Sequence, residues 1–159
     1  QVVVVVQNLA IGQSYQGGII AYIDSTGQHG LIVATEDQSE EIQWWNGSYV
    51  VTGATGTAIG TGLANTNAII AAQGSGSYAA SIARDYNGGG YTDWYLPSKD
   101  ELNQLYVNKA AIGGGFANDY YWSSTEYDSN YTWLQYFSNG AQDVYIKGFP
   151  IYVRAVRAF

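Results

Sequence analysis

The stretch Asp93-Trp94-Tyr95-Leu96-Pro97-Ser98-Lys99-Asp100-Glu101-Leu102 decides most of what the sequence says about the fold. Ser98 and Glu101 have the S-x-x-E spacing of a capping box, in which each side chain accepts a hydrogen bond from the other residue's backbone N–H. Asp100 and Glu101 also place negative charge at the positive end of the helix dipole. The pattern predicts a helix over 99–108 that ends before the glycines at 113–115. Four side chains around this helix are expected to be buried in the core of the domain: Trp94, Leu96, Leu102 and Leu105.

Strand-like segments lie on both sides of this helix. They are short, rich in β-branched and aromatic residues, and separated by turn residues such as Ser25-Thr26-Gly27-Gln28. The strands are expected over residues 18–24, 30–35, 42–45, 120–123, 131–137, 143–147 and 151–157. Two more short helices are expected over 67–73 and 77–85. The fold class is therefore α+β, with short central helices and a mainly antiparallel sheet.

The composition narrows the functions that the chain can have. Its 159 residues fit one domain, and 6 Lys+Arg against 13 Asp+Glu give a net charge of −7. A nucleic-acid partner would need clustered cations, so none is expected. There is no cysteine and a single histidine, His29, which argues against thiol chemistry, cofactors and multi-histidine metal sites. No stretch of about 20 apolar residues would span a membrane. The many Tyr, Gly, Ser, Thr and Asn residues favour an extracellular or cell-surface protein.

Three features could carry chemistry, and each has a plainer interpretation. The loop 52–62 precedes a helix but lacks the lysine of a phosphate-binding loop, so a structural role is favoured. His29 has no nucleophile motif to serve and is expected to be a hydrogen-bonded structural residue. Glu126, Asp128 and Asn130 are weak candidates for a calcium site, because the spacing of a calcium-binding loop is missing. No catalytic residues are expected, and the chain is predicted not to be an enzyme.

Adjacent aromatic residues recur along the chain, and neighbours on a strand point to opposite faces. One ring of each pair should fill the core, while the other can reach a ligand at the surface. The possible ligand contacts are Trp45, Tyr91, Tyr127 and Tyr131. Arg154 and Arg157, three apart on one predicted strand, should face opposite ways, and at least one should form an ion pair with a carboxylate.

Several motifs together resemble one family. The segment from Asp93 to Asn103 is joined by Tyr121-Trp122-Ser123-Ser124-Thr125-Glu126-Tyr127, Phe137-Ser138-Asn139-Gly140 and Tyr152-Val153-Arg154-Ala155-Val156-Arg157. This set is similar to the C-terminal domain family of Legionella collagen-like adhesins, to which the Fibrobacter major paralogous domain is related, over about residues 15–159. The resemblance implies a C-type-lectin-like fold in secreted or surface-anchored bacterial proteins. The Legionella adhesin binds sulfated polysaccharide, and the charge of −7 departs from that expectation.

Five consecutive valines, Val2, Val3, Val4, Val5 and Val6, precede the part that resembles the family. The chain therefore divides into an N-terminal strand extension and connector, 1–14, and a domain, 15–159. The continuous run of valines is typical of a strand buried on both faces. Such an uncharged segment would be prone to aggregate if it stayed in water. Pairing with a sheet edge of a neighbouring copy would bury it, and would produce a filament or a closed oligomer. The alternative is pairing with the sheet of its own domain.

Two functions therefore compete. One is a structural surface protein that binds copies of itself through the valine strand. The other is an adhesin domain that recognises a glycan or a surface protein through exposed aromatic loops.

Overall fold

The computed structural model describes residues 1–3 and 7–159, which form an α+β fold with two sheets. The four-stranded sheet has the order β1-β2-β3-β9, and the five-stranded sheet has the order β4-β8-β5-β6-β7. The strands are β1 (Ser14–Tyr15), β2 (Gly18–Ile23), β3 (Gly30–Val33), β4 (Ser39–Ile42), β5 (Tyr120–Glu126), β6 (Tyr131–Tyr136), β7 (Gln142–Ile146), β8 (Ile151–Val153) and β9 (Val156–Ala158). All neighbouring strands are antiparallel except β5 and β8, which are parallel. The predicted fold class is confirmed, and this architecture is consistent with the C-type-lectin-like fold that the resemblance implies.

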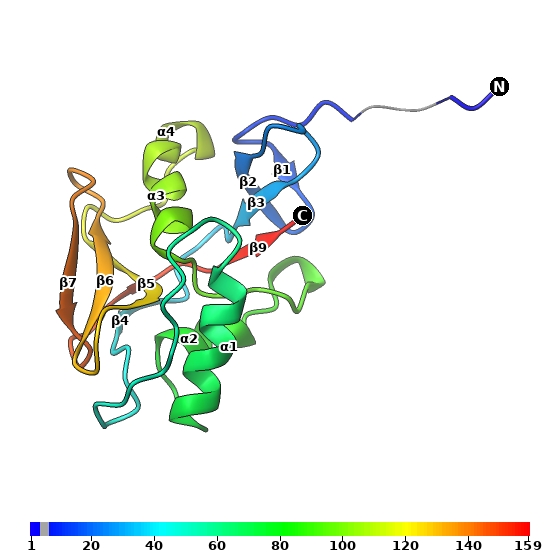
Figure 1. Cartoon of the computed structure of the whole chain (residues 1–159). Coiled ribbons are helices and arrows are strands. Elements are labelled where there is room, and N and C mark those ends of the chain that lie inside the picture. Colours follow the sequence, from blue (N-terminus) through cyan, green and yellow to red (C-terminus); the bar gives the residue numbers. More distant parts are fainter. Residues whose placement is uncertain (4–6) are drawn as a thin grey trace.

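Four α-helices pack between and below the sheets: α1 (Gly62–Gln73), α2 (Ala79–Asp85), α3 (Lys99–Val107) and α4 (Lys109–Ile112), with a 3₁₀ turn at Gly88–Gly90. Figure 1 shows β6 and β7 on one flank of the molecule and β1–β3 on the other. Helices α3 and α4 lie between these flanks, and α1 and α2 lie side by side at the opposite end. The helices thus leave the outer edge strand, β7, at the surface.

Helix α3 begins as the capping box predicts. The Glu101 backbone N–H donates to Ser98 Oγ at 3.3 Å, and the Ser98 backbone N–H donates to Glu101 Oε1 at 2.9 Å. Trp94, Leu96, Leu102 and Leu105 are all at most 1% exposed, as expected. The local sequence signal and the tertiary packing agree here.

Helix α1 begins five residues before the predicted start at residue 67, and therefore includes the last glycine of the loop 52–62. Gly62 packs directly on the loop before α3: a Cβ at this position would collide with the carboxylate of Glu101 and the ring of Tyr95. The helix start is set by this close approach between distant segments, a contact that helix signals in the local sequence do not contain.

The predicted strand over 151–157 is wrong in one respect, because it is two strands. β8 pairs with β4 and β5, while β9 pairs with β3 in the other sheet. The chain leaves one sheet and enters the other at Arg154-Ala155, so the two arginines lie beside different sheets. Similarly, the expected strand at 42–45 lies earlier, at Ser39–Ile42, and β1 begins at Ser14, the last residue of the segment 1–14 assigned to the extension and connector.

The core has two neighbouring parts. One contains the tryptophans Trp44, Trp94 and Trp122, all fully buried, against α1 and α2. The other contains Tyr121 and Phe137 against α3. At least one ring of each adjacent aromatic pair is therefore in the core, as the strand pattern predicts, and both rings of Trp94-Tyr95 are buried.

The N-terminal segment differs from the rest of the chain in its exposure. Val2 and Val3 are 91% and 80% exposed, and neither belongs to a strand, so the burial predicted for these two valines is absent within a single copy. The same prediction for Val4, Val5 and Val6 falls on residues that lie outside the described part of the chain. Gln7 is in contact with the domain, because its side-chain oxygen accepts a hydrogen bond from the Tyr15 hydroxyl at 3.2 Å.

Candidate functional site

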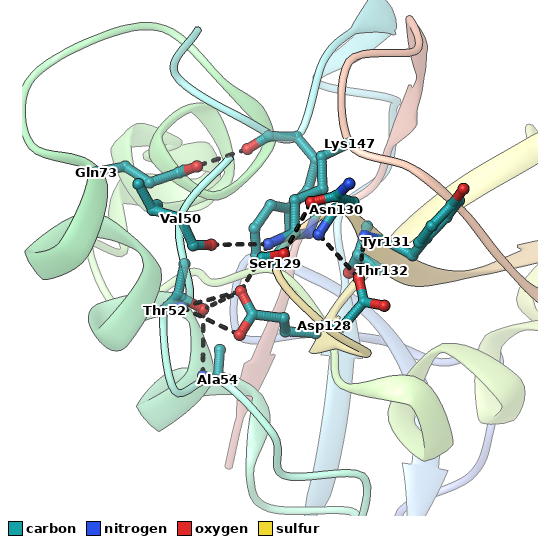
Figure 2. A network of polar contacts seen from close by, with 12 residues as sticks. Val50, Thr52, Ala54, Gln73, Asp128, Ser129, Asn130, Tyr131, Thr132 and Lys147 are labelled. Carbon is teal, nitrogen blue, oxygen red and sulfur yellow. Dashed lines mark hydrogen bonds and ion pairs between the residues drawn. The ribbon is translucent and has the colours of Figure 1, made fainter. Parts of the chain in front are cut away.

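A buried ion pair joins the end of β5 to the residue after β7. Lys147 Nζ lies 2.7 Å from Glu126 Oε2, and both side chains are at most 2% exposed. The ammonium also donates to the Val50 carbonyl at 3.0 Å, a contact drawn in Figure 2. The Thr52 backbone N–H and hydroxyl donate to Glu126 at 3.0 and 2.9 Å. Each charge has partners, which is the condition under which burial of an ion pair is tolerated.

This arrangement bears directly on the calcium candidates. The Lys147 ammonium occupies the position beside Glu126 that a metal cation would need. Asp128 accepts hydrogen bonds from the backbone N–H groups of Asn130 and Tyr131, both at 2.8 Å, and so shapes the β5–β6 turn (Figure 2). Within residues 1–3 and 7–159, no three His, Cys, Asp or Glu side chains form a group suited to a metal ion. All three candidate side chains make polar contacts within the protein: Glu126 with Lys147, Asp128 with the turn amides, and Asn130 with Ser129 Oγ at 2.8 Å.

The loop 52–62 has the same character. Its amide groups donate to acceptors of the protein itself: Gly56 N–H to Asn65 Oδ1 at 3.1 Å and Gly60 N–H to Glu101 Oε2 at 3.2 Å. These two contacts agree with the structural interpretation of the loop. His29 is exposed at the β2–β3 turn, and its ring makes no hydrogen bond with the described residues, so the expected hydrogen-bonded role is wrong.

The four predicted ligand contacts do not form one site. Tyr91 is half-buried beside the four-stranded sheet, with its ring centroid 3.8 Å from the Arg157 guanidinium. Trp45 is half-buried against Tyr49, at 4.6 Å between ring centroids. Only Tyr127 and Tyr131, 59% and 40% exposed, lie together, at the β5–β6 turn.

A larger aromatic surface lies on the five-stranded sheet, and the sequence interpretation missed it. Tyr120 of β5 stacks on Tyr136 of β6, with ring centroids 4.5 Å apart and planes inclined by 19°. Tyr145 of β7 lies nearly parallel to Tyr120, and Phe149 packs edge-on against Tyr145 at 4.8 Å. Tyr120, Tyr145 and Phe149 are 41%, 41% and 48% exposed. We call these four residues the tyrosine platform.

A signal for this platform was present in the sequence. Tyr120 adjoins Tyr121, and the alternation of a strand places one of them outside once the other is buried. Phe149 lies between Gly148 and Pro150, in a turn that exposes its ring. The missing information was the register that places Tyr120 opposite Tyr136 on neighbouring strands.

The positive charges are all used within the fold. Arg154 and Arg157 pair with Asp37 and Asp93, each at 2.7 Å, which confirms the expected ion pair. The Arg157 contact lowers the pKa of the Asp93 carboxyl below its usual range. The other four cations also have partners: Arg84 on the Thr92 carbonyl, Lys99 over the Trp133 ring, Lys109 on the Phe137 carbonyl and Lys147 on Glu126. No cluster of cations in the described chain is therefore available for a polyanion such as a sulfated polysaccharide.

Comparison with known proteins agrees with this fold. The described residues include no helix with the length and apolarity needed to cross a membrane. No curated protein matches the chain. The family model described as Lcl C-terminal domain matches residues 33–157, which include the whole five-stranded sheet and all four helices, but only Val33 and Val156-Arg157 of the four-stranded sheet. The chain belongs to the Lcl C-terminal domain family, and is therefore related to adhesin-type surface proteins.

Proposed function

We propose that this chain is a non-enzymatic, extracellular structural protein of the bacterial surface that binds copies of itself through Val2–Val6. The exposure of Val2 and Val3, at 91% and 80%, is the observation that carries the proposal. Family membership supports the surface location.

Association would remove the apolar surface of the exposed valines from water. Fully burying one such side chain is worth about 1.5–3 kcal/mol, so a valine strand buried on both faces is a strong contact. Uncharged β-branched segments left in water also tend to aggregate without order. A specific partner strand removes that hazard.

The open edge of the five-stranded sheet fits such a strand. β7 is the outermost strand and, like the valine run, has five residues. Its pairing with β6 leaves the backbone groups of Gln142, Val144 and Ile146 directed away from the sheet. The Val144 N–H donates only to the adjacent Asp143 side chain, at 2.7 Å. An added strand from a neighbouring copy would satisfy these groups by β-augmentation.

The contact joins two different surfaces, the N-terminal strand of one copy and β7 of the next. Such a heterologous contact repeats from copy to copy, so it produces a filament when the rotation does not close and a ring when it does. Electron microscopy and sedimentation of the intact chain distinguish these two products.

The decisive variant replaces all five residues Val2–Val6 with serine, and the matched control replaces them with isoleucine. We expect the serine variant to sediment as a folded monomer and the isoleucine control to assemble like the intact chain. Val144→Pro should also prevent assembly, because proline removes the outward N–H of β7. An intact chain that stays monomeric, with a serine variant that unfolds, would assign the strand to its own domain.

Ligand binding is the second candidate, favoured by the 59% exposure of Tyr127 beside Tyr131 at the β5–β6 turn. Exposed aromatic rings stack well on sugars and on protein partners. Glycan-array binding by the soluble serine variant, lost on Tyr127→Ala, would support this function. Ordered polymers without array binding would support the structural function.

A further inference from the structure

A slot opens in the tyrosine platform. It is a hollow of about 140 Å³ whose lining includes the nearly buried side chains of Leu134 and Ile151 and the exposed rings of Tyr120, Tyr145 and Phe149. Asp119 and Pro150 complete its rim. Since the buried residues form the base and the exposed rings stand around it, we call this hollow the tyrosine slot.

The aromatic rings of the slot favour a flat group. The centroids of Tyr120 and Tyr145 are 6.5 Å apart, and their planes are inclined by only 21°. A group held between two rings needs about 3.5 Å to each, about 7 Å in all, so the slot takes a flat group stacked on one exposed ring rather than inserted between the two. A saturated sugar ring is puckered and carries substituents on its faces, so it stacks less closely than a flat group does.

An acidic hollow adjoins the slot. It has a volume of about 160 Å³, shares Asp119, Pro150 and Ile151 with the slot, and adds Glu40, Glu41 and Tyr152. None of its three carboxylates pairs with a lysine or arginine of the described chain. The pKa of the Tyr152 hydroxyl is raised, first by desolvation and then by charges that include Glu40 and Asp119. The local field is therefore negative.

We infer that the tyrosine slot and the acidic hollow together bind the arginine side chain of a basic peptide segment in a partner protein. A guanidinium is flat and delocalised, stacks on aromatic rings, and donates two parallel hydrogen bonds to a carboxylate. Stacking on one exposed ring of the slot leaves its edge free for Asp119, while further positive charge on the peptide faces Glu40 and Glu41. The charge of the site is complementary to such a segment.

The partner is another protein rather than a second copy. Arg154 and Arg157 of this chain are held in ion pairs, and Arg84 donates to the carbonyls of Thr92 and Trp94. The slot contains none of residues 2–6, although Tyr145 lies on β7, the strand proposed above to accept the valine run. The inference does not depend on self-association.

The test uses the intact chain and three capped peptides that are identical except for two central positions, which hold arginine, lysine or citrulline. Citrulline keeps the flat shape of arginine without its charge. We expect the arginine peptide to bind most tightly by calorimetry, the citrulline peptide about tenfold more weakly, and added salt to weaken the arginine complex. Lysine should fall between them, since its ammonium does not stack as a plane.

Variants of the slot and of the acidic hollow test where the arginine peptide binds. Tyr145→Ala and Glu40→Gln/Glu41→Gln should each weaken the arginine peptide roughly tenfold while the melting temperature stays nearly unchanged. The matched controls are Tyr127→Ala, an exposed tyrosine at the other turn, and Glu36→Gln, and both should bind normally. Equal binding of the three peptides, an equal loss in the controls, or Tyr145-dependent binding of a neutral oligosaccharide in preference to the arginine peptide would overturn the inference.

Discussion

Two adjacent tyrosines of β5, Tyr120 and Tyr121, lie in opposite environments, one at the surface and one in the core. Tyr121 is fully buried, with its ring 4.6 Å from Phe137 and its hydroxyl hydrogen-bonded to Asp37 and to the Ala117 N–H, both at 2.9 Å. Tyr120 is 41% exposed, and its aromatic contacts are with the platform rings Tyr136 and Tyr145. The alternation of the strand separates a ring with a fully satisfied hydroxyl from one that water and partners can reach.

The difference teaches how to interpret a tyrosine-rich sequence. A buried tyrosine needs a partner for its hydroxyl, whereas a surface tyrosine needs none. The buried rings Tyr95 and Tyr121 each have a carboxylate partner, Glu101 and Asp37. The platform rings have no such fixed partner among the described residues, and are therefore free to serve contacts with other molecules.

The largest effect should come from truncating the buried ring. Tyr121→Ala is expected to lower the free energy of unfolding by about 3–5 kcal/mol, because it leaves a cavity against Phe137. Tyr120→Ala, the matched change one residue away, should cost about 1 kcal/mol or less, since one stacked pair at the surface is lost. Urea unfolding of both variants measures the contrast, and equal costs would contradict the assignment of the two faces.

The second prediction concerns the buried ion pair of Glu126 and Lys147, at the far end of β5. Glu126→Gln or Lys147→Met alone should each cost about 3–5 kcal/mol, because the remaining charge loses its partner in a buried site. The double variant should cost clearly less than the sum of the two. A double-mutant cycle by chemical denaturation gives the coupling. Costs that add up within error would show that the two charges do not stabilise one another.

Alkaline pH should weaken the fold through two of its buried tyrosines, Tyr95 and Tyr121. Burial, followed by the nearby carboxylate Glu101 for Tyr95 and by Asp37 for Tyr121, raises the pKa of both hydroxyls far above the usual 10.0. The unfolded chain loses these protons above pH 10 while the folded chain keeps them. Stability is therefore complete below that pH, and should fall above it by about 1.4 kcal/mol per pH unit for each of the two residues.

This slope is measured by urea unfolding at several pH values on either side of the transition, about pH 9 to 11. In Tyr121→Phe the slope should decrease by the share of one residue. A slope that Tyr121→Phe leaves unchanged would contradict the raised pKa of this buried hydroxyl.

The parts of the fold that the sequence predicts are those whose cause is local. The capping box of Ser98 and Glu101 lies within four residues, so the start of α3 could be predicted to the residue. One ring of the adjacent pair Trp44-Trp45 is buried, as expected, although the two residues follow β4 and do not lie in a strand.

The parts that the sequence does not predict depend on contacts between distant segments. Gly62 begins α1 because it packs on Glu101, and Arg154 leaves the sheet of β8 to reach Asp37. The platform needs the register of β5 against β6, which the sequence of either strand alone does not contain. The ligand contacts chosen from loop aromatics missed the platform for that reason.

The contacts of the lysine and arginine side chains within the fold also affect cleavage by proteases that cut after lysine or arginine. No such residue precedes Arg84 in the sequence, so trypsin has no site at which to release the N-terminal segment. Lys147, Arg154 and Arg157 have side chains at most 7% exposed, which keeps three of the six possible cleavage sites out of reach in the folded state. The ion pairs that bury these side chains thus also protect the C-terminal strands, from β7 to β9, against a common class of protease.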